Sequence, residues 1–176
     1  MMGDLMQMAK NAGFSHAGPL DAATLELKEE VRQMCAACGQ YGKRWSCPPG
    51  CGSLEDLRAK VGGYKTGILV QTTGQLEDAF DGEAMMETEA LHKENFARLQ
   101  KMLRPSYPGL LALGAGCCTI CKSCTYPDGP CRFPEQMVSS MEAYGLVVTE
   151  VCRANGLAYN YGENTITYTS CILLKE

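Results

Sequence analysis

Apolar residues recur every three or four positions along much of the chain, and glycine or proline residues mark the ends of these runs. This spacing is typical of helices that bury one face. It predicts helices over residues 4–12, from Asp21 to Cys35, from Ser53 to Gly62, from Gly82 to Arg104 and from Pro134 to Tyr144. Asp21 and Ser53 are suitable N-caps, because their side-chain oxygens can accept hydrogen bonds from the first turn of a helix.

Shorter runs that are rich in apolar and β-branched residues and bounded by turn residues predict strands. They cover residues 64–73, 110–115, 157–161 and 165–174, and residues 146–154 are expected to form a strand followed by a helix. The turn at residues 162–164 would join the last two strands as a hairpin. Helices alternating with about four strands indicate an α/β (α+β) fold with a mixed sheet. We expect one domain over residues 1–176, with two cysteine-rich metal-binding loops at the sheet margins.

Composition and charge narrow the possible partners. With 45% hydrophobic residues, the 176-residue chain can build a real core. Its net charge of −4 argues against a nucleic-acid partner, because phosphate binding needs a basic face. No apolar run approaches the ~20 residues that a membrane span requires, so we expect no membrane partner.

The chain contains 11 cysteines, which fits either a secreted disulfide framework or intracellular thiolates that hold metal. The first residues, Met1 to Met6, lack the basic start and apolar run of a secretory signal. The odd count and the clustered Cys-x-x-Cys spacing also suit metal ligation better than bridging. We therefore expect a cytoplasmic protein with reduced cysteines.

The clearest candidate site lies in the second cysteine-rich run. Cys118, Cys121 and Cys124 are three residues apart, and Cys131 follows beside Pro130. Two Cys-x-x-Cys steps and a further cysteine next to proline are typical of ferredoxin-type sites, and thiolate is the ligand that iron–sulfur clusters select. A 4Fe-4S cluster is the favoured interpretation. A zinc knuckle that only holds the loop together is the alternative.

A second set of four cysteines lies upstream. Cys35 and Cys38 form one pair, and Cys47 and Cys51 form another, separated by eight residues. Zinc sites also use this format, so the metal here is either a second 4Fe-4S cluster or zinc. Of the eight proposed ligands, Cys51 has the least support from the sequence, because its glycine neighbours would equally suit a simple turn.

Positive charge accompanies this first set. Residues 31–54 contain no acidic residue but include Arg32, Lys43 and Arg44. Because a cluster held by four thiolates is anionic, such cations would offset its charge and tend to raise its reduction potential. A solvated basic loop without this role is the alternative.

The remaining candidates have simpler interpretations. Cys117 is adjacent to Cys118, and neighbouring side chains rarely face one metal, so we expect it to be a spectator. Cys152 and Cys171 lie in apolar patterns, where single cysteines behave as small hydrophobic residues. His92 lies on the apolar face of its predicted helix, which favours a core histidine over a ligand.

Two motifs together resemble a known family. They are Cys35-x-x-Cys38-x-x-Tyr41-Gly42-Lys43 leading to Cys47-Pro48-Pro49, and the second run ending Pro130-Cys131-Arg132-x-Pro134. In these motifs the chain is similar to an uncharacterised prokaryotic family described as predicted metal-binding proteins. The family domain covers most of the chain, and the resemblance implies that the protein binds metal.

Three functions are compatible with these patterns. The first is a cytoplasmic protein with two 4Fe-4S clusters that carries single electrons to or from a partner enzyme, so a redox partner protein is expected. The second is a zinc-stabilised interaction module without a redox role. The third is an iron–sulfur enzyme with an open iron position, which would exist if Cys51 is not a ligand.

Overall fold

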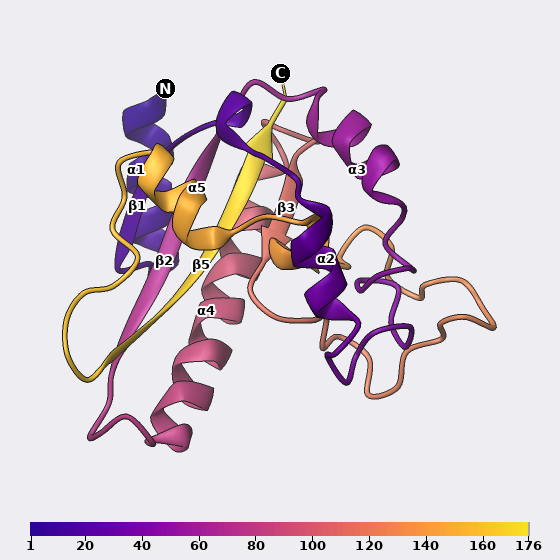
Figure 1. Ribbon diagram of the computed structural model, residues 1–176. Coiled ribbons are helices and arrows are strands. Elements are labelled where there is room, and N and C mark those ends of the chain that lie inside the picture. The colour runs from indigo at the N-terminus through magenta and orange to yellow at the C-terminus, as the bar shows by residue number, and fades with distance from the viewer. Residues whose placement is uncertain (176) are drawn as a thin grey trace.

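The computed structural model describes residues 1–175, which fold around one mixed five-stranded sheet between two helical layers (Figure 1). The strands are β1 (His16–Asp21), β2 (Thr66–Gln75), β3 (Leu111–Gly114), β4 (Ser139–Ser140) and β5 (Thr165–Leu174). The α-helices are α1 (Met2–Ala12), α2 (Glu29–Cys35), α3 (Leu54–Val61), α4 (Gly82–Leu103) and α5 (Val148–Ala154), with 3-10 turns η1 (Ala22–Thr24) and η2 (Glu142–Tyr144). The predicted α+β class is confirmed, with one strand more than expected.

The sheet has the order β1-β2-β5-β3-β4. Neighbouring strands are antiparallel except for β3 and β4, which are parallel. The two longest strands, β2 and β5, pair along their whole length, from Thr66 opposite Leu174 to Gln75 opposite Thr165. They therefore form the rigid centre of the molecule, and the shorter strands β3 and β4 lie to one side of it.

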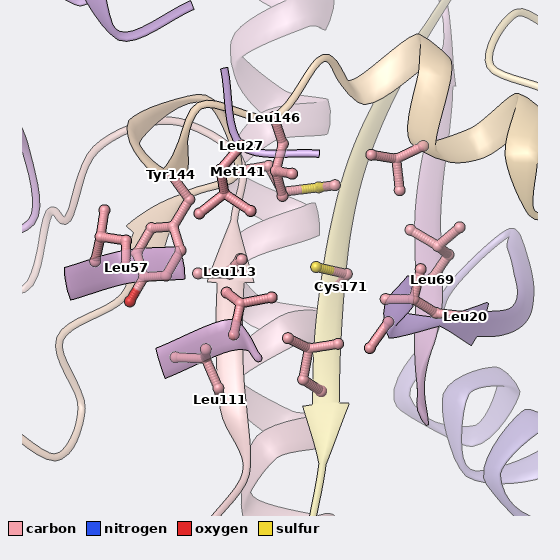
Figure 2. Close-up of a cluster of buried hydrophobic side chains, with 14 of the residues drawn as sticks. Leu20, Leu27, Leu57, Leu69, Leu111, Leu113, Met141, Tyr144, Leu146 and Cys171 are labelled. Carbon is pink, nitrogen blue, oxygen red and sulfur yellow. The ribbon is translucent and has the colours of Figure 1, made fainter. Parts of the chain in front are cut away.

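Both faces of the sheet are buried. Successive side chains of a strand point to opposite faces, so Ile68 and Val70 pack towards α1 and α4 while Leu69 packs towards α3 and η2. Figure 2 shows the second of these cores around Leu113, Met141 and Cys171. Full burial of one such leucine stabilises the fold by about 1.5–3 kcal/mol. Because both faces of the sheet are buried, the central strands carry consecutive apolar residues rather than an alternation of apolar and polar ones.

Six predicted elements are confirmed with small shifts at their ends. These are the elements now labelled α1, α3, α4, β2, β3 and β5. Their boundaries have the expected physical causes: Gly13 ends α1 with φ of 108°, and the Ser53 hydroxyl caps α3 by accepting from the Asp56 N–H. The helical part of residues 146–154 is α5, but the strand predicted at the start of this segment does not form.

The predicted helix from Asp21 to Cys35 is wrong in its first half. Asp21 instead ends β1, and its side chain caps the short turn η1 by accepting from the Ala23 N–H. The chain then runs extended, and Lys28 N–H donates to the Gly145 carbonyl at 2.8 Å before α2 begins. Strand β1 was not predicted, because its sequence contains both Gly18 and Pro19; an edge strand tolerates proline.

Two further predictions near the C-terminus are wrong. The segment from Pro134 to Tyr144 is not an α-helix but contains β4 and η2, because it pairs with β3 and Met141 N–H donates to the Gly114 carbonyl. Residues 157–161 form no strand and no hairpin with β5. This segment is held instead by the Gln71 amide, which donates to the Ala158 carbonyl at 2.7 Å.

None of the helices within residues 1–175 is long and apolar enough to cross a membrane.

Candidate metal centre

The two cysteine-rich segments are loops that lie beside each other at one end of the fold. We call residues 36–53, between α2 and α3, the first cysteine loop, and residues 115–138, between β3 and β4, the second cysteine loop. In Figure 1 they project together on the right, away from the centre of the sheet. Of the elements that anchor them, α3 and β3 contribute side chains to one apolar core, and α2 packs against η2, whose Tyr144 belongs to that core.

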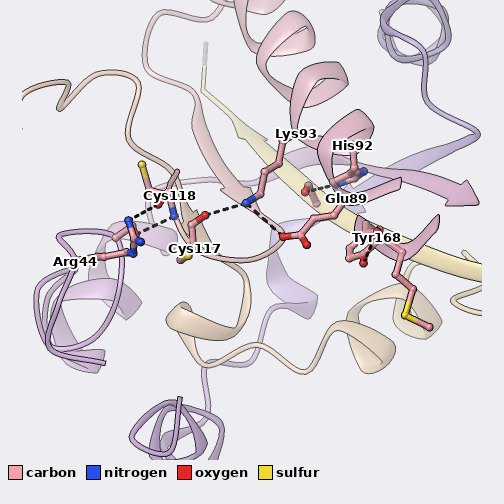
Figure 3. Close-up of polar contacts among 10 residues, drawn as sticks. Arg44, Glu89, His92, Lys93, Cys117, Cys118 and Tyr168 are labelled. Atoms are coloured by element: carbon pink, nitrogen blue, oxygen red, sulfur yellow. Dashed lines mark hydrogen bonds and ion pairs between the residues drawn. The ribbon is translucent and has the colours of Figure 1, made fainter. Parts of the chain in front are cut away.

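Direct hydrogen bonds join the two loops. The Arg44 guanidinium donates to the Cys118 carbonyl at 3.0 Å, a contact that Figure 3 shows. The Ser46 hydroxyl, only 1% exposed, accepts from the Cys118 N–H at 3.2 Å. The Trp45 indole N–H donates to the Gly129 carbonyl at 3.0 Å. Three consecutive residues of the first loop thus hold the second.

Aromatic packing adds to this junction. The rings of Trp45 and Tyr126 meet edge to face, with centroids 4.9 Å apart and planes at 89°. Gly50 completes the contact, because a Cβ there would lie 2.7 Å from the Arg44 carbonyl oxygen and 2.8 Å from the Tyr126 ring. Edge-to-face pairs contribute about 0.5–1.5 kcal/mol beyond the area they bury. The loops therefore form one packed unit rather than two independent arms.

All four thiols of the second set line one small cavity. Cys118, Cys121, Cys124 and Cys131 share its wall with side chains of the first loop, including Arg44 and Trp45. Burial by itself would raise the pKa of the Cys124 thiol. Backbone N–H groups of Tyr126 and Trp45, together with the charges of Arg44 and Arg132, outweigh burial and lower this pKa below its ordinary value. Thiolate is the form that binds metal, so the surroundings of Cys124 favour ligation.

The first set is built where α2 ends and α3 is about to begin. The Arg32 guanidinium lies 3.7 Å from the Cys51 sulfur. The thiols of Cys35 and Cys51 each lie 3.9 Å from a carbonyl of η2, those of Glu142 and Ala143 respectively. The turn η2 therefore closes the side of this site that faces the core.

Mutual repulsion and burial affect the thiols of the first set. Burial raises the pKa values of Cys35, Cys47 and Cys51. Neighbouring thiolates raise them further, Cys38 acting on Cys35, and Cys51 acting on Cys47. The Arg32 charge opposes this rise at Cys51. These thiols thus lie within electrostatic reach of one another, and a metal that binds them must displace their protons.

The donor set fits a thiolate-bound metal, although the ligand shell is not closed. Across residues 1–175, no three His, Cys, Asp or Glu side chains come close enough to hold an ion as they stand. However, the buried Nε of Arg32 has no hydrogen-bond partner in that part of the chain. Burying a donor without an acceptor costs about 1–3 kcal/mol. An anionic metal–thiolate centre next to Cys51 would supply the acceptor.

A family model described as "Predicted metal-binding protein (DUF2284)" matches residues 18–174. The chain belongs to this family. The resemblance drawn from the cysteine motifs is therefore confirmed, and metal binding is the function predicted for the family. No match was found among curated proteins or among solved structures.

In this DUF2284 protein, the side chains set aside as structural behave as expected. Cys152 and Cys171 are fully buried in the core. The ring of His92 is 1% exposed, and its nitrogens bond to the hydroxyls of Thr72 and Ser170 at 2.9 and 2.7 Å. The interpretation of His92 as a core histidine is confirmed.

The structure also brings residues to the centre that sequence patterns did not indicate. Cys117, interpreted as a spectator, lies close enough to Cys47 for its charge to raise the pKa of that thiol. Its carbonyl accepts from Lys93 of α4 at 3.2 Å, as Figure 3 shows. Lys93 carries no motif signal, since it resembles any solvated helix lysine.

Proposed function

We propose that the protein is an iron–sulfur electron carrier with two 4Fe-4S clusters. Cys35, Cys38, Cys47 and Cys51 would hold one cluster, and Cys118, Cys121, Cys124 and Cys131 the other. The observation that carries the proposal is the packing of the two loops, because Arg44, Trp45 and Ser46 of the first contact the second directly. Two sets of four thiols are thereby held at one end of a rigid sheet.

This arrangement suits electron transfer more than substrate chemistry at the metal. Clusters of this kind take up and release single electrons at potentials set by charge, hydrogen bonds and exposure. The protein contributes the positions of the thiols, the cations Arg32 and Arg44, and the N–H groups that face Cys124. Rigid supporting contacts of this type keep a site in one geometry, which outer-sphere transfer requires.

Charge indicates the nature of the partner. The first cysteine loop, residues 36–53, carries a net charge of +2, the second, residues 115–138, is neutral, and the whole chain carries −4. With Arg32 beside Cys51, the first loop forms a cationic patch on an otherwise acidic protein. Exposed apolar side chains lie in or beside the same loops, including Tyr41 at 42% and Ile120 at 45% exposed. We propose that a redox partner with an acidic face docks here, steered by opposite charge.

The metal content tests the proposal most directly. Full-length protein purified without oxygen is expected to be brown, with about eight irons and eight acid-labile sulfides per chain if both clusters are 4Fe-4S. The cysteine spacing of the first set also occurs in zinc sites, so a second outcome is zinc bound by the first set and one cluster bound by the second. Colourless protein with stoichiometric zinc in both loops would overturn the electron-carrier proposal.

The docking charge is tested by the rate of oxidation of the reduced protein. Ferricyanide, an anion, should react more slowly with a Lys43→Glu variant by about two- to tenfold at low salt, because the attraction is weakened. A cationic cobalt(III) hexaammine should react faster with the same variant. Lys10→Glu on α1, also an exposed lysine, is the matched control and should change neither rate. Equal effects at both positions would contradict a cationic docking patch.

A further inference from the structure

A cavity of about 520 Å³ lies between α4 and the second cysteine loop. This volume falls within the range of about 300–1,000 Å³ found for small-molecule sites. Side chains of α4 form one wall, and residues 114–120 with 136 and 138 form the other. His92 and Ser170, which bond to each other, also contribute to the lining. Figure 3 shows Lys93 reaching from α4 to Cys117 across part of this region.

The charges that line the cavity are of one sign. Lys93, Lys101 and Arg104 contribute to its wall, and no aspartate or glutamate does. Lys93 is partly neutralised by Glu89, whose carboxylate lies 3.4 Å away. In the described chain, residues 1–175, neither Lys101 nor Arg104 takes part in an ion pair. Two cations without a counter-charge, near the C-terminal end of α4, therefore face this space.

The rest of the lining is apolar or neutral. Phe96 is 5% exposed within the wall, and Ile120 and Val138 face it from the other side. Burial lowers the pKa of His92 to about 4, so this side chain is neutral at physiological pH. Arg104 is held in place, because its guanidinium donates to the Glu135 carbonyl at 2.8 Å. The cavity thus combines an apolar wall with a fixed cationic end.

We propose that this cavity binds a small organic anion, a carboxylate or a phosphate ester with an apolar body. The anionic group would lie against Lys101 and Arg104, and the body between Phe96 and Ile120. Cys118 and Ile120 line both this cavity and the smaller one that the second cysteine set surrounds. A bound anion would therefore lie next to the second metal centre. The inference goes beyond the proposed function and does not depend on it.

Three matched probes test the inference by calorimetric titration of the full-length protein. 2-Naphthoate and 1-naphthyl phosphate carry the two anionic groups, and 2-naphthamide is the neutral analogue. We expect at least one anion to bind about tenfold more tightly than the amide, since charge-assisted hydrogen bonds are the strong ones. The tighter anion identifies which of the two chemistries the site prefers.

Variants locate the binding. Lys101→Met and Arg104→Met should each weaken the anion about three- to tenfold and leave the amide unchanged. Ala97→Trp, at an exposed position of α4 that lines the cavity, should weaken all three probes by filling the space. Lys10→Met on α1 removes the same charge elsewhere and should have no effect. Equal affinity for the anions and the amide, no binding at all, or parent-like binding by both Met variants would overturn the proposal.

Iron and zinc analysis of the same samples separates this inference from the proposed function. Anion binding by colourless zinc protein would support the cavity site and refute the electron carrier. Brown protein with two clusters that binds none of the probes would refute the cavity site and leave the carrier standing.

Discussion

The junction between the two cysteine loops makes a sharp prediction for Gly50→Ala. Gly50 lies between the Arg44 carbonyl and the ring of Tyr126, so an added methyl would meet the carbonyl oxygen at 2.7 Å and the ring at 2.8 and 3.1 Å. Contacts below 3.0 Å cannot persist, and one of the two neighbours must move. The carbonyl belongs to backbone, whereas Tyr126 belongs to the other loop. We therefore expect the second cysteine loop to be displaced from the first.

The size of the effect follows from overpacking. Inserting a methyl group where no space exists typically costs about 1–3 kcal/mol. For a domain of this length each kcal/mol lowers the unfolding temperature by about 2–4 °C, so we expect a fall of about 2–12 °C. Gly50 has no positive φ that alanine would strain, so the cost comes from the contact alone.

Gly39→Ala in the same loop is the matched control, because a Cβ there meets nothing within 4 Å. It should leave stability unchanged or raise it by about 0.4–1 kcal/mol through the unfolded state, an effect that both variants share. Thermal unfolding by circular dichroism and metal content would be measured on both proteins, prepared without oxygen. If Gly50→Ala and Gly39→Ala unfold at the same temperature and hold the same metal, the packed junction described above is wrong.

Two further predictions concern the ligands and the buried histidine. Cys121→Ala should remove close to half the iron and leave the first centre intact, whereas Cys38→Ala should deplete both centres, as spectra and iron content would report; depletion confined to one centre in both variants would contradict this. Burial lowers the pKa of His92 to about 4 from 6.5, so the unfolded chain binds the proton first as pH falls. The contribution of neutral His92 to the free energy of unfolding is therefore fully present above pH 6.5 and is lost as the pH falls to 4. Across that interval the free energy of unfolding of the parent should fall by about 3 kcal/mol more than that of His92→Gln. Denaturant titrations at pH 7 and pH 4 would measure this difference, and parallel losses in both proteins would refute it.

Sequence reasoning predicted the fold best where local and tertiary preferences agree. Helix α4 and strands β2 and β5 are long, strongly patterned and buried where the pattern says, so their prediction succeeded. It failed where pairing with a distant segment decides the conformation. The segment from Pro134 to Tyr144 has a helical apolar spacing, but Ser139 and Ser140 pair with β3 and the helix does not form. Strand β1 is likewise stabilised by its neighbour β2 rather than by its own glycine and proline.

The candidate site divides in the same way. Spacing alone selected the eight cysteines, because ligand geometry constrains residues that are close in sequence. Spacing could not reveal that Trp45 contacts Gly129 or that Arg44 contacts Cys118, since these residues lie more than seventy positions apart. In the sequence, Lys101 and Arg104 look like ordinary solvent-exposed residues of a helix. Only the folded structure shows that the second loop lies opposite them and encloses a cavity.

If each set of four cysteines holds a metal, the loop junction makes the two centres unequal. Arg44, Trp45 and Ser46 lie between Cys38 and Cys47, so a metal that binds the first set would fix the very residues that hold the second loop. The first set depends instead on Arg32 and on the carbonyls of η2, which belong to the packed core. Metal binding and folding are coupled in such loops. We therefore expect the first loop to become ordered on the core when it binds metal, and the second loop to become ordered on the first. A metal held by the second set is therefore the one whose occupancy a change elsewhere in the loops would alter most.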